Sequence, residues 1–196
     1  MKNLNGIKIV YHPNKILFTP CRPIDVSEKN RNLIKQILKE MKYTMQNITG
    51  FYEDNCLGLA ANQIGYNYKI MIISKYPKID RLKNKVVDIM INPEITYFSD
   101  LDNLKWEGCI SDKNNMLLIQ RPEIVKIKYI DENFEKKEKL LSEIHSRIVQ
   151  HEIDHLNGID LYDRNIFDKI SIKSLEEDEQ TYKEWFEEAR LRNFFF

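Results

Sequence analysis

Two histidines that stand four residues apart constrain the fold of this chain more than any other feature. They lie in the segment QHEIDHL, residues 150–156, as His151 and His155. On an α-helix, side chains at positions i and i+4 lie one turn apart on the same face, so both imidazoles can bind one metal ion. Glu152 lies beside them, where its carboxylate can take a proton from a metal-bound water. The segment therefore predicts a metal-binding helix, although two ordinary helical histidines would give the same spacing.

The helix supplies only two ligands, whereas a catalytic site of this type has three protein ligands and one open position. Gluzincins use a glutamate from a following helix, and metzincins use a third histidine in HExxHxxGxxH. Gly158 matches the metzincin glycine, but Leu161 stands at the position of the third histidine, and no histidine follows His155. The residues leave two kinds of candidate. One is a carboxylate after Gly158, and the other is an upstream thiolate, Cys109 in the segment EGCIS.

The composition is that of one folded domain. The chain has 196 residues, of which 42% are apolar and 31% are charged. A domain of this size buries about 70% of the surface of the unfolded chain, which provides one sizeable core. Thirty basic residues balance thirty acidic residues, so the net charge is zero. Because no overall field attracts polyanions or anionic lipid, we expect neither DNA nor a membrane as a partner.

Cysteine usage and the N-terminus indicate a cytoplasmic protein. Three cysteines do not make a disulfide framework, and we interpret Cys21 and Cys56 as packing residues. Residues 1–14 contain no apolar signal core. No apolar stretch approaches the length of about 20 residues that a membrane-spanning helix needs.

Hydrophobic periodicity predicts two helices in the body of the chain. The first begins after Asp25, which forms a capping box with Glu28, and ends at Gly50. Its apolar residues recur at steps of three and four. The second runs from about Ser142 to Asn157 and carries the two histidines.

Short strands are expected between these helices, and together they predict the fold class. The strand-like runs are residues 69–74, residues 86–91 ending at Pro93, and residues 124–130, followed by a turn at 131–133. We predict an α+β fold: a compact single domain in which the metal-binding helix packs against short antiparallel β-sheets. A C-terminal helix is expected to follow, with an aromatic stripe of Tyr182, Trp185, Phe186 and Ala189.

Three segments connect these observations to a known family. They are GLAANQIG at residues 58–65, EGCIS at residues 107–111 and QHEIDHLNG at residues 150–158. In this order and at this spacing they closely resemble the peptide deformylase family, and the likeness covers about residues 5–165. The resemblance implies a deformylase-like catalytic domain at residues 1–167 and an amphipathic helical tail at residues 168–196.

The resemblance also implies a reaction, a metal and its ligands. The family removes the formyl group from the N-terminal formyl-methionine of newly made polypeptides. The ligands implied are Cys109, His151 and His155, which hold one divalent ion: Fe²⁺ in the cell, with Zn²⁺, Ni²⁺ or Co²⁺ as alternatives. The partners implied are N-formyl-methionyl nascent peptides, with the ribosome as a further candidate, and we expect a monomer.

Further residues receive roles through the same resemblance. Glu152 takes the proton of the attacking water and later passes it to the departing amine. The Gln63 side-chain amide and the Ile110 backbone N–H are the donors for the developing oxyanion. The substrate-binding residues implied are Leu57, Gly58, Ile144 and Ile148. Asp154 is expected to orient a neighbour by a hydrogen bond.

The chain departs from the family pattern at several positions. Cys56 stands where glycine is usual, Asn62 where proline or threonine is frequent, and Ile110 where leucine is usual. Residues 112–116 replace a Pro-Gly turn and its nearby arginine, and the next arginine is Arg121. These residues are expected to form an altered substrate-facing loop.

Two other functions compete with deformylation. A metallopeptidase would use the same two histidines, but it would need a third ligand downstream. A metal-binding protein that has lost turnover would fit the altered residues 112–116.

Overall fold

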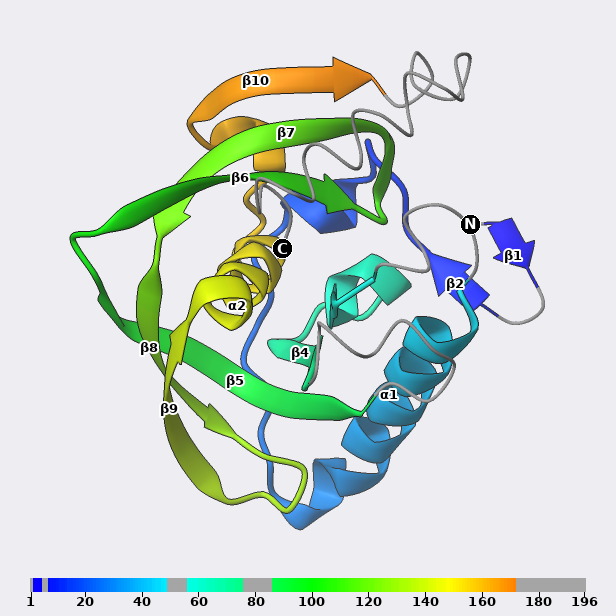
Figure 1. Cartoon of the computed structure of the whole chain (residues 1–196). Coiled ribbons are helices and arrows are strands. Elements are labelled where there is room, and N and C mark those ends of the chain that lie inside the picture. Colours follow the sequence, from blue (N-terminus) through cyan, green and yellow to red (C-terminus); the bar gives the residue numbers. More distant parts are fainter. Residues whose placement is uncertain (1, 5–6, 49–55, 76–85, 172–196) are drawn as a thin grey trace.

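The computed structural model describes residues 2–4, 7–48, 56–75 and 86–171 (Figure 1). Its helices are α1 (Glu28–Asn47) and α2 (Glu143–Leu156), with the short 3-10 helices η1 (Lys15–Phe18), η2 (Ala61–Ile64) and η3 (Leu161–Asp163). Its strands are β1 (Lys2–Leu4), β2 (Ile7–Ile9), β3 (Gly58–Ala60), β4 (Ile70–Ser74), β5 (Val87–Phe98), β6 (Asp102–Cys109), β7 (Asp112–Pro122), β8 (Ile124–Ile130), β9 (Lys136–Ser142) and β10 (Ile166–Ser171).

Within the described ranges, all paired strands are antiparallel, and they form three sheets. The largest has the order β3-β4-β5-β8-β9, the second has the order β10-β7-β6, and β1 pairs with β2. Together with two longer helices, these sheets confirm the predicted α+β class.

Helix α2 lies between the two larger sheets (Figure 1). It contacts β3, β4, β8 and β9 on one side and β7 on the other. Because the sheets cover α2 on both sides, polar as well as apolar side chains of the helix are buried. The buried polar residues include Gln150, His151, Glu152, Asp154 and His155. The helix that carries the metal-binding motif is therefore interior, where buried polar groups need partners.

Both predicted helices are confirmed, but the N-terminal cap of α1 is different. Ser27 is the N-cap residue and makes no capping hydrogen bond through its side chain. Asp25 accepts hydrogen bonds from the backbone N–H and the hydroxyl of Ser27, so the capping box with Glu28 does not form. The helix ends at Asn47, and Gly50 lies outside the described residues.

Pro93 does not end its strand, as the sequence had led us to expect. Strand β5 continues to Phe98, and its register with β8 shifts between Ile91 and Glu94. Proline has no N–H to donate, so it is tolerated where a bulge interrupts the ladder. Asn92, with φ of 48°, lies in the same bulge, and its side-chain amide bonds both the N–H and the carbonyl of Ile24.

Residues 112–116 do not form the expected loop. They begin β7, which pairs with β6 on one side and with β10 on the other. Strand β10 crosses the predicted domain boundary at residue 167, and residues 172–196 lie outside the described part. The division into domain and tail, and the C-terminal helix, therefore stay predictions.

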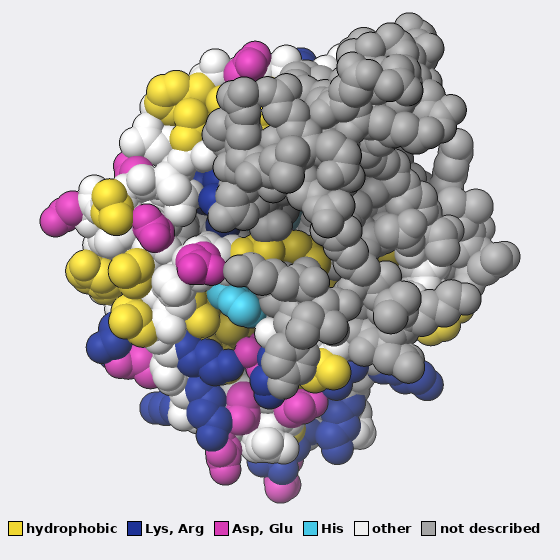
Figure 2. Space-filling view, in the orientation of Figure 1, with side chains coloured by type: hydrophobic (Ala, Val, Ile, Leu, Met, Phe, Trp, Pro, Cys, Tyr) yellow, Lys and Arg dark blue, Asp and Glu magenta, His cyan; other side chains and the backbone are white. Residues whose placement is uncertain are grey.

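The surface agrees with the balanced composition. Figure 2 shows basic and acidic side chains interspersed over the lower part of the face that it draws. In the described ranges, no helix combines the length and the hydropathy that crossing a membrane requires.

Truncation tests the predicted boundary. A chain that ends after Ser171 should bind metal like the full chain, because all predicted ligands precede this point. A chain that ends after Arg164 should lose β10, whose Ile166 packs against the buried Leu117 and Ile119. We expect its free energy of unfolding to fall by about 2 kcal/mol or more. Metal content and urea unfolding measure the two outcomes, and failure of the longer chain to bind metal would show that the boundary is wrong.

Candidate metal centre and active site

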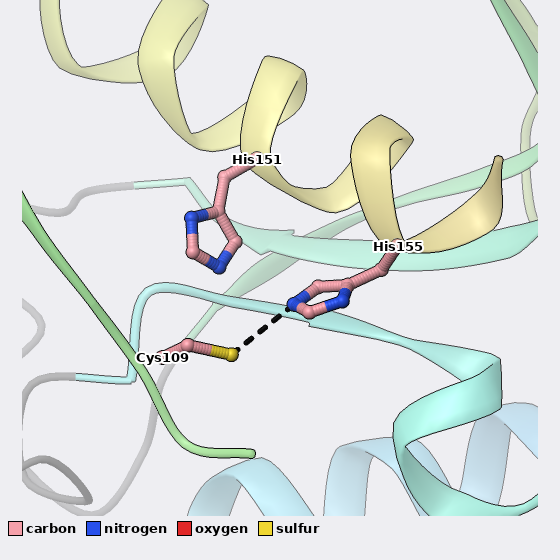
Figure 3. A group of neighbouring side chains, drawn as sticks. All are labelled: Cys109, His151 and His155. Carbon is pink, nitrogen blue, oxygen red and sulfur yellow. Dashed lines mark hydrogen bonds between the residues drawn. The ribbon is translucent and has the colours of Figure 1, made fainter. Parts of the chain in front are cut away.

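The three expected metal ligands lie together in the structure (Figure 3). Cys109 is the last residue of β6, whereas His151 and His155 project from successive turns of α2. Their ligand atoms all lie within 4.8 Å of one another, and Cys109 Sγ lies 3.2 Å from His155 Nε2. All three side chains are buried. The geometry thus favours the upstream thiolate over a downstream carboxylate as third ligand.

These donors fit a divalent transition-metal ion. One sulfur and two imidazole nitrogens suit a tetrahedral ion with a fourth, open position. Burial alone would raise the pKa of the Cys109 thiol, but His155 and His151 beside it lower this pKa to about 5. The thiolate, which is the form that binds metal, therefore predominates at neutral pH.

Glu107 orients His151 and was not predicted as a site residue. Its Oε2 lies 3.0 Å from His151 Nδ1. Burial opposes the charge of Glu107, but Arg121 and His151 hold its pKa far below the ordinary value. An ionised carboxylate can only accept, so Nδ1 carries the proton and Nε2 is left free to bind metal. The segment EGCIS contained this residue, but nothing local in it indicated a partner 44 residues away.

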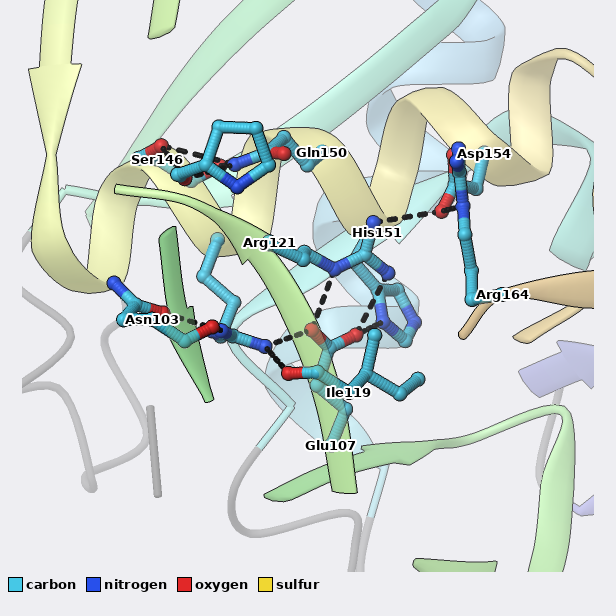
Figure 4. Close-up of polar contacts among 11 residues, drawn as sticks. Asn103, Glu107, Ile119, Arg121, Ser146, Gln150, His151, Asp154 and Arg164 are labelled. Atoms are coloured by element: carbon cyan, nitrogen blue, oxygen red, sulfur yellow. Dashed lines mark hydrogen bonds and ion pairs between the residues drawn. The ribbon is translucent and has the colours of Figure 1, made fainter. Parts of the chain in front are cut away.

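Two arginines neutralise the Glu107 carboxylate (Figure 4). Arg121 donates through Nε and Nη2, at 2.5 and 2.8 Å, and Arg147 donates through Nη1. Arg121 also donates through Nη1 to Asp154 at 2.8 Å, and Arg164 donates to the same carboxylate. Asp154 thus orients a neighbour, as expected. Arg121 is buried in this network, so it does not face a substrate.

Glu152 is buried beside the metal ligands. Its Oε2 has no hydrogen-bond partner within the described part of the chain. Burial raises the pKa of Glu152 to about 7, although His151 and His155 oppose this rise. A Cβ added at Gly58 would overlap Oε1 of Glu152. The glycine therefore leaves space for the carboxylate, a role that the sequence did not reveal.

Gln63 faces the same group. The backbone N–H of Ala60 donates to Gln63 Oε1 at 2.8 Å, which directs Nε2 toward the ligands. Nε2 lies 3.2 Å from Ser111 Oγ, 3.1 Å from His155 Nε2 and 3.5 Å from Cys109 Sγ. The side-chain amide is thus fixed next to the predicted metal position.

Asn62 explains one departure from the family pattern. It is fully buried, and its Nδ2 donates to the carbonyl of His155 at 2.6 Å. This hydrogen bond ties η2, which carries Gln63, to the end of α2. Neither proline nor a shorter threonine side chain offers that amide donor.

The remaining predicted residues lie in two places. Ile110 follows Cys109 in the turn between β6 and β7, and its side chain is buried in the core next to α1. Leu57, Ile144 and Ile148 belong to one apolar cluster beside α2. The structure brings these three together, and their contact with a substrate stays a prediction.

Comparison with known proteins decides the family. A family model described as polypeptide deformylase matches residues 7–175. This chain belongs to the polypeptide deformylase family. It is 37% identical to a peptide deformylase of Aquifex aeolicus over 156 residues, which are 80% of this chain and 85% of the relative. It is 34% identical to that of a Synechocystis species over 159 residues, 81% and 78% of the two chains.

A solved structure agrees with this assignment. The Met-Ala-Ser-bound class I type b peptide deformylase of Acinetobacter baumannii superposes with a TM-score of 0.69 at 32% identity. The match covers 81% of this chain and 98% of that chain. The chain is therefore an enzyme of this family, a hydrolase that removes the N-formyl group from new polypeptides. Family membership argues against both alternatives, the metal-binding protein without turnover and the metallopeptidase.

Replacing Cys109 tests the ligand set. We expect Cys109→Ala to bind metal much more weakly, because two imidazoles alone hold the ion poorly. Loss of a residue that only hydrogen-bonds a ligand costs about 10–100-fold in affinity, and loss of a ligand should cost at least as much. Cys21→Ala is the matched control, since Cys21 is also a buried free thiol but packs in an apolar cluster. Metal analysis of the purified proteins measures the effect. Equal metal content in Cys109→Ala and wild type would remove Cys109 from the site.

Replacing Gly58 tests the space around Glu152. Gly58→Ala should keep the metal but lower kcat about 100-fold, because the added methyl group displaces the carboxylate by about 1 Å. Steady-state kinetics with a formyl-methionyl peptide measure this loss. In a Glu152→Gln background the same change should cost much less, and an equal loss in both backgrounds would contradict the assigned role.

Proposed function

We propose that Glu152 is the general acid–base of deformylation at a metal ion held by Cys109, His151 and His155. When bound, a divalent ion there supplies Lewis-acid polarisation of the formyl carbonyl and makes water a stronger nucleophile. The observation that carries the proposal is the buried Glu152 Oε2, which has no partner in the described part of the chain. Buried polar oxygens normally have a hydrogen-bond partner, so this oxygen is available to water or substrate.

Glu152 serves both proton steps in this proposal. Its Oε2 accepts the proton of the attacking water, and the protonated carboxyl then donates it to the departing amine. Gly58 allows the carboxylate to lie close to β3, and covering of α2 on both sides excludes bulk water.

Two donors stabilise the negative charge that develops on the formyl oxygen. Gln63 Nε2 is one, and the hydrogen bond from Ala60 to Gln63 Oε1 holds it in place. The backbone N–H of Ile110 is the other, and the position of Ile110 directly after Cys109 supports this role. Donors that are fixed before the reaction lower the barrier because they need no reorganisation.

The substrate is the N-terminal formyl-methionine of a nascent peptide. Leu57, Ile144 and Ile148 share an apolar cluster that suits the methionine side chain. Gly58 binds the peptide through its own backbone in this proposal, because Glu152 fills the space beside its Cα. The Acinetobacter baumannii enzyme, a relative of this chain, has been solved with the short peptide Met-Ala-Ser bound. The resident metal in this proposal is Fe²⁺, the protein is a cytoplasmic monomer, and the ribosome is the candidate partner that presents the nascent chain.

Two substitutions test the mechanism. Glu152→Gln should retain fold and metal but lose about 10⁴-fold in rate, the upper end for general acid–base catalysis, because one group serves both proton steps. Gln63→Ala should lose less, about 10²–10³-fold, since it removes one of two oxyanion donors. Formate release by anaerobically prepared, iron-loaded protein measures both.

The control is Glu135→Gln, which changes an exposed carboxylate between β8 and β9 and should leave the rate unchanged. If Glu152→Gln with full metal content keeps more than about a tenth of the wild-type rate, Glu152 is not the acid–base.

A further inference from the structure

The turn that carries Cys109 is poorly held by its own sheet. Gly108 pairs with Met116, but Cys109 pairs with Asp112, so residues 113–115 have no partner on β6. The ladder is therefore interrupted next to a metal ligand. Contacts outside the ladder therefore fix the turn relative to α2, which carries the two histidines, and Glu107 and Gln63 provide two of them.

We propose that a clasp of four residues supplies such a contact and helps to set the distance between Cys109 and His155. The clasp joins the turn to the segment that follows α2, and its members are His12, Asp112, Asp160 and Tyr162. This proposal rests on the proposed function, because it takes Cys109 and His155 as ligands of one ion. Its members are positioning residues, which act through the turn and do not touch the substrate.

The first half of the clasp is centred on Tyr162 in η3. The hydroxyl of Tyr162 donates to Asp112 Oδ2 at 2.7 Å and accepts from Asn115 Nδ2, also at 2.7 Å. Asp112 precedes the residues that have no partner on β6, and Asn115 is the last of them, although it pairs with Ser171 of β10. The tyrosine thereby replaces the strand pairing that β6 does not provide.

The second half of the clasp is centred on His12, which contacts both the turn and the segment that follows α2. Its backbone N–H donates to the carbonyl of Ser111 at 2.9 Å, and its Nε2 lies 3.2 Å from Asp160 Oδ2. Asp160 Oδ1 in turn accepts from the backbone N–H of Tyr162 at 3.0 Å. The contacts therefore close a ring that runs from the turn through His12, Asp160 and Tyr162 back to Asp112.

This ring adjoins the metal ligands. Its four members line a cavity of about 20 Å³ together with Cys109 and His155. His12 and Tyr162 are about one-third exposed, so each contact is individually weak. We therefore expect loss of one contact to loosen the ligand geometry and to change global stability little.

Removing one hydroxyl tests the clasp. Tyr162→Phe keeps the aromatic side chain and deletes only the hydrogen bonds of its hydroxyl to Asp112 and Asn115. The matched control is Tyr66→Phe, which deletes a tyrosine hydroxyl that donates to Glu40 at 3.0 Å on α1. Each protein is loaded with Co²⁺, and release of the ion to a chelator, the thiolate–cobalt absorption band, kcat and KM are measured.

We expect Tyr162→Phe to release Co²⁺ about 3–10 times faster than wild type, below the 10–100-fold effect of direct partners of ligands. The thiolate band should shift, and kcat should fall by a similar factor with KM nearly unchanged. Tyr66→Phe should match wild type. If Tyr162→Phe lowers only the unfolding temperature and releases the ion like Tyr66→Phe, the clasp is structural and the proposal is overturned.

A second variant separates the clasp from other effects of Tyr162. Asp112→Ala should accelerate release similarly. Tyr162→Phe should add less in that background than in wild type, because the bond between Tyr162 and Asp112 is already gone and only the bond to Asn115 remains to be lost. Additive effects would overturn the proposal. A wild-type protein that holds Co²⁺ but releases no formate would instead refute the proposed function, and the release rates would still decide the clasp.

Discussion

The buried carboxylate of Glu107 is the interaction on which the rest of the site depends. It comes from β6 and is fully buried, and it accepts hydrogen bonds from Arg121 of β7 and from His151 and Arg147 of α2. A buried charge is tolerated only when it is paired, and removing one partner of such a pair costs about 3–5 kcal/mol. The same carboxylate therefore joins the hairpin that carries Cys109 to the helix that carries the histidines. Metal-ligand geometry and the packing of α2 therefore both depend on this carboxylate.

Because α2 is covered on both sides, the residues that pack against it must fit closely. The segment from Gly58 to Gln63 packs against the helix, and three of its residues have a specific contact there. Gly58 leaves room for Glu152, Asn62 bonds the carbonyl of His155, and Gln63 points its amide at the ligands. Electrostatic interactions are stronger in such a water-poor interior, which suits a site that must stabilise charge during reaction.

Sequence reasoning failed where long-range pairing overrides local pattern. Residues 112–116 contain polar residues typical of a loop, yet they begin strand β7, because its ends pair with neighbouring strands: Asp112 and Met116 with β6, and Asn115 and Met116 with β10. Pro93 is typical of a strand end, yet β5 passes through it at a bulge. Strands β6 and β9 show no simple alternation, because Glu107 is buried through its ion pairs and most of β9 is exposed at the edge of its sheet.

The sequence alone determined both long helices, the β8 strand and, through its motifs, the family and the group of three residues that could hold a metal ion. Each of these depends on spacing within a few residues, where the period of a helix or strand dictates which side chains share a face. Only the tertiary structure decided that Glu107 fixes the tautomer of His151, that Arg121 is buried, and that Tyr162 contacts Asp112. Those partners lie 14–50 residues apart in the chain. No local period relates such distant residues, because the folded arrangement of sheets around α2 is what brings them into contact.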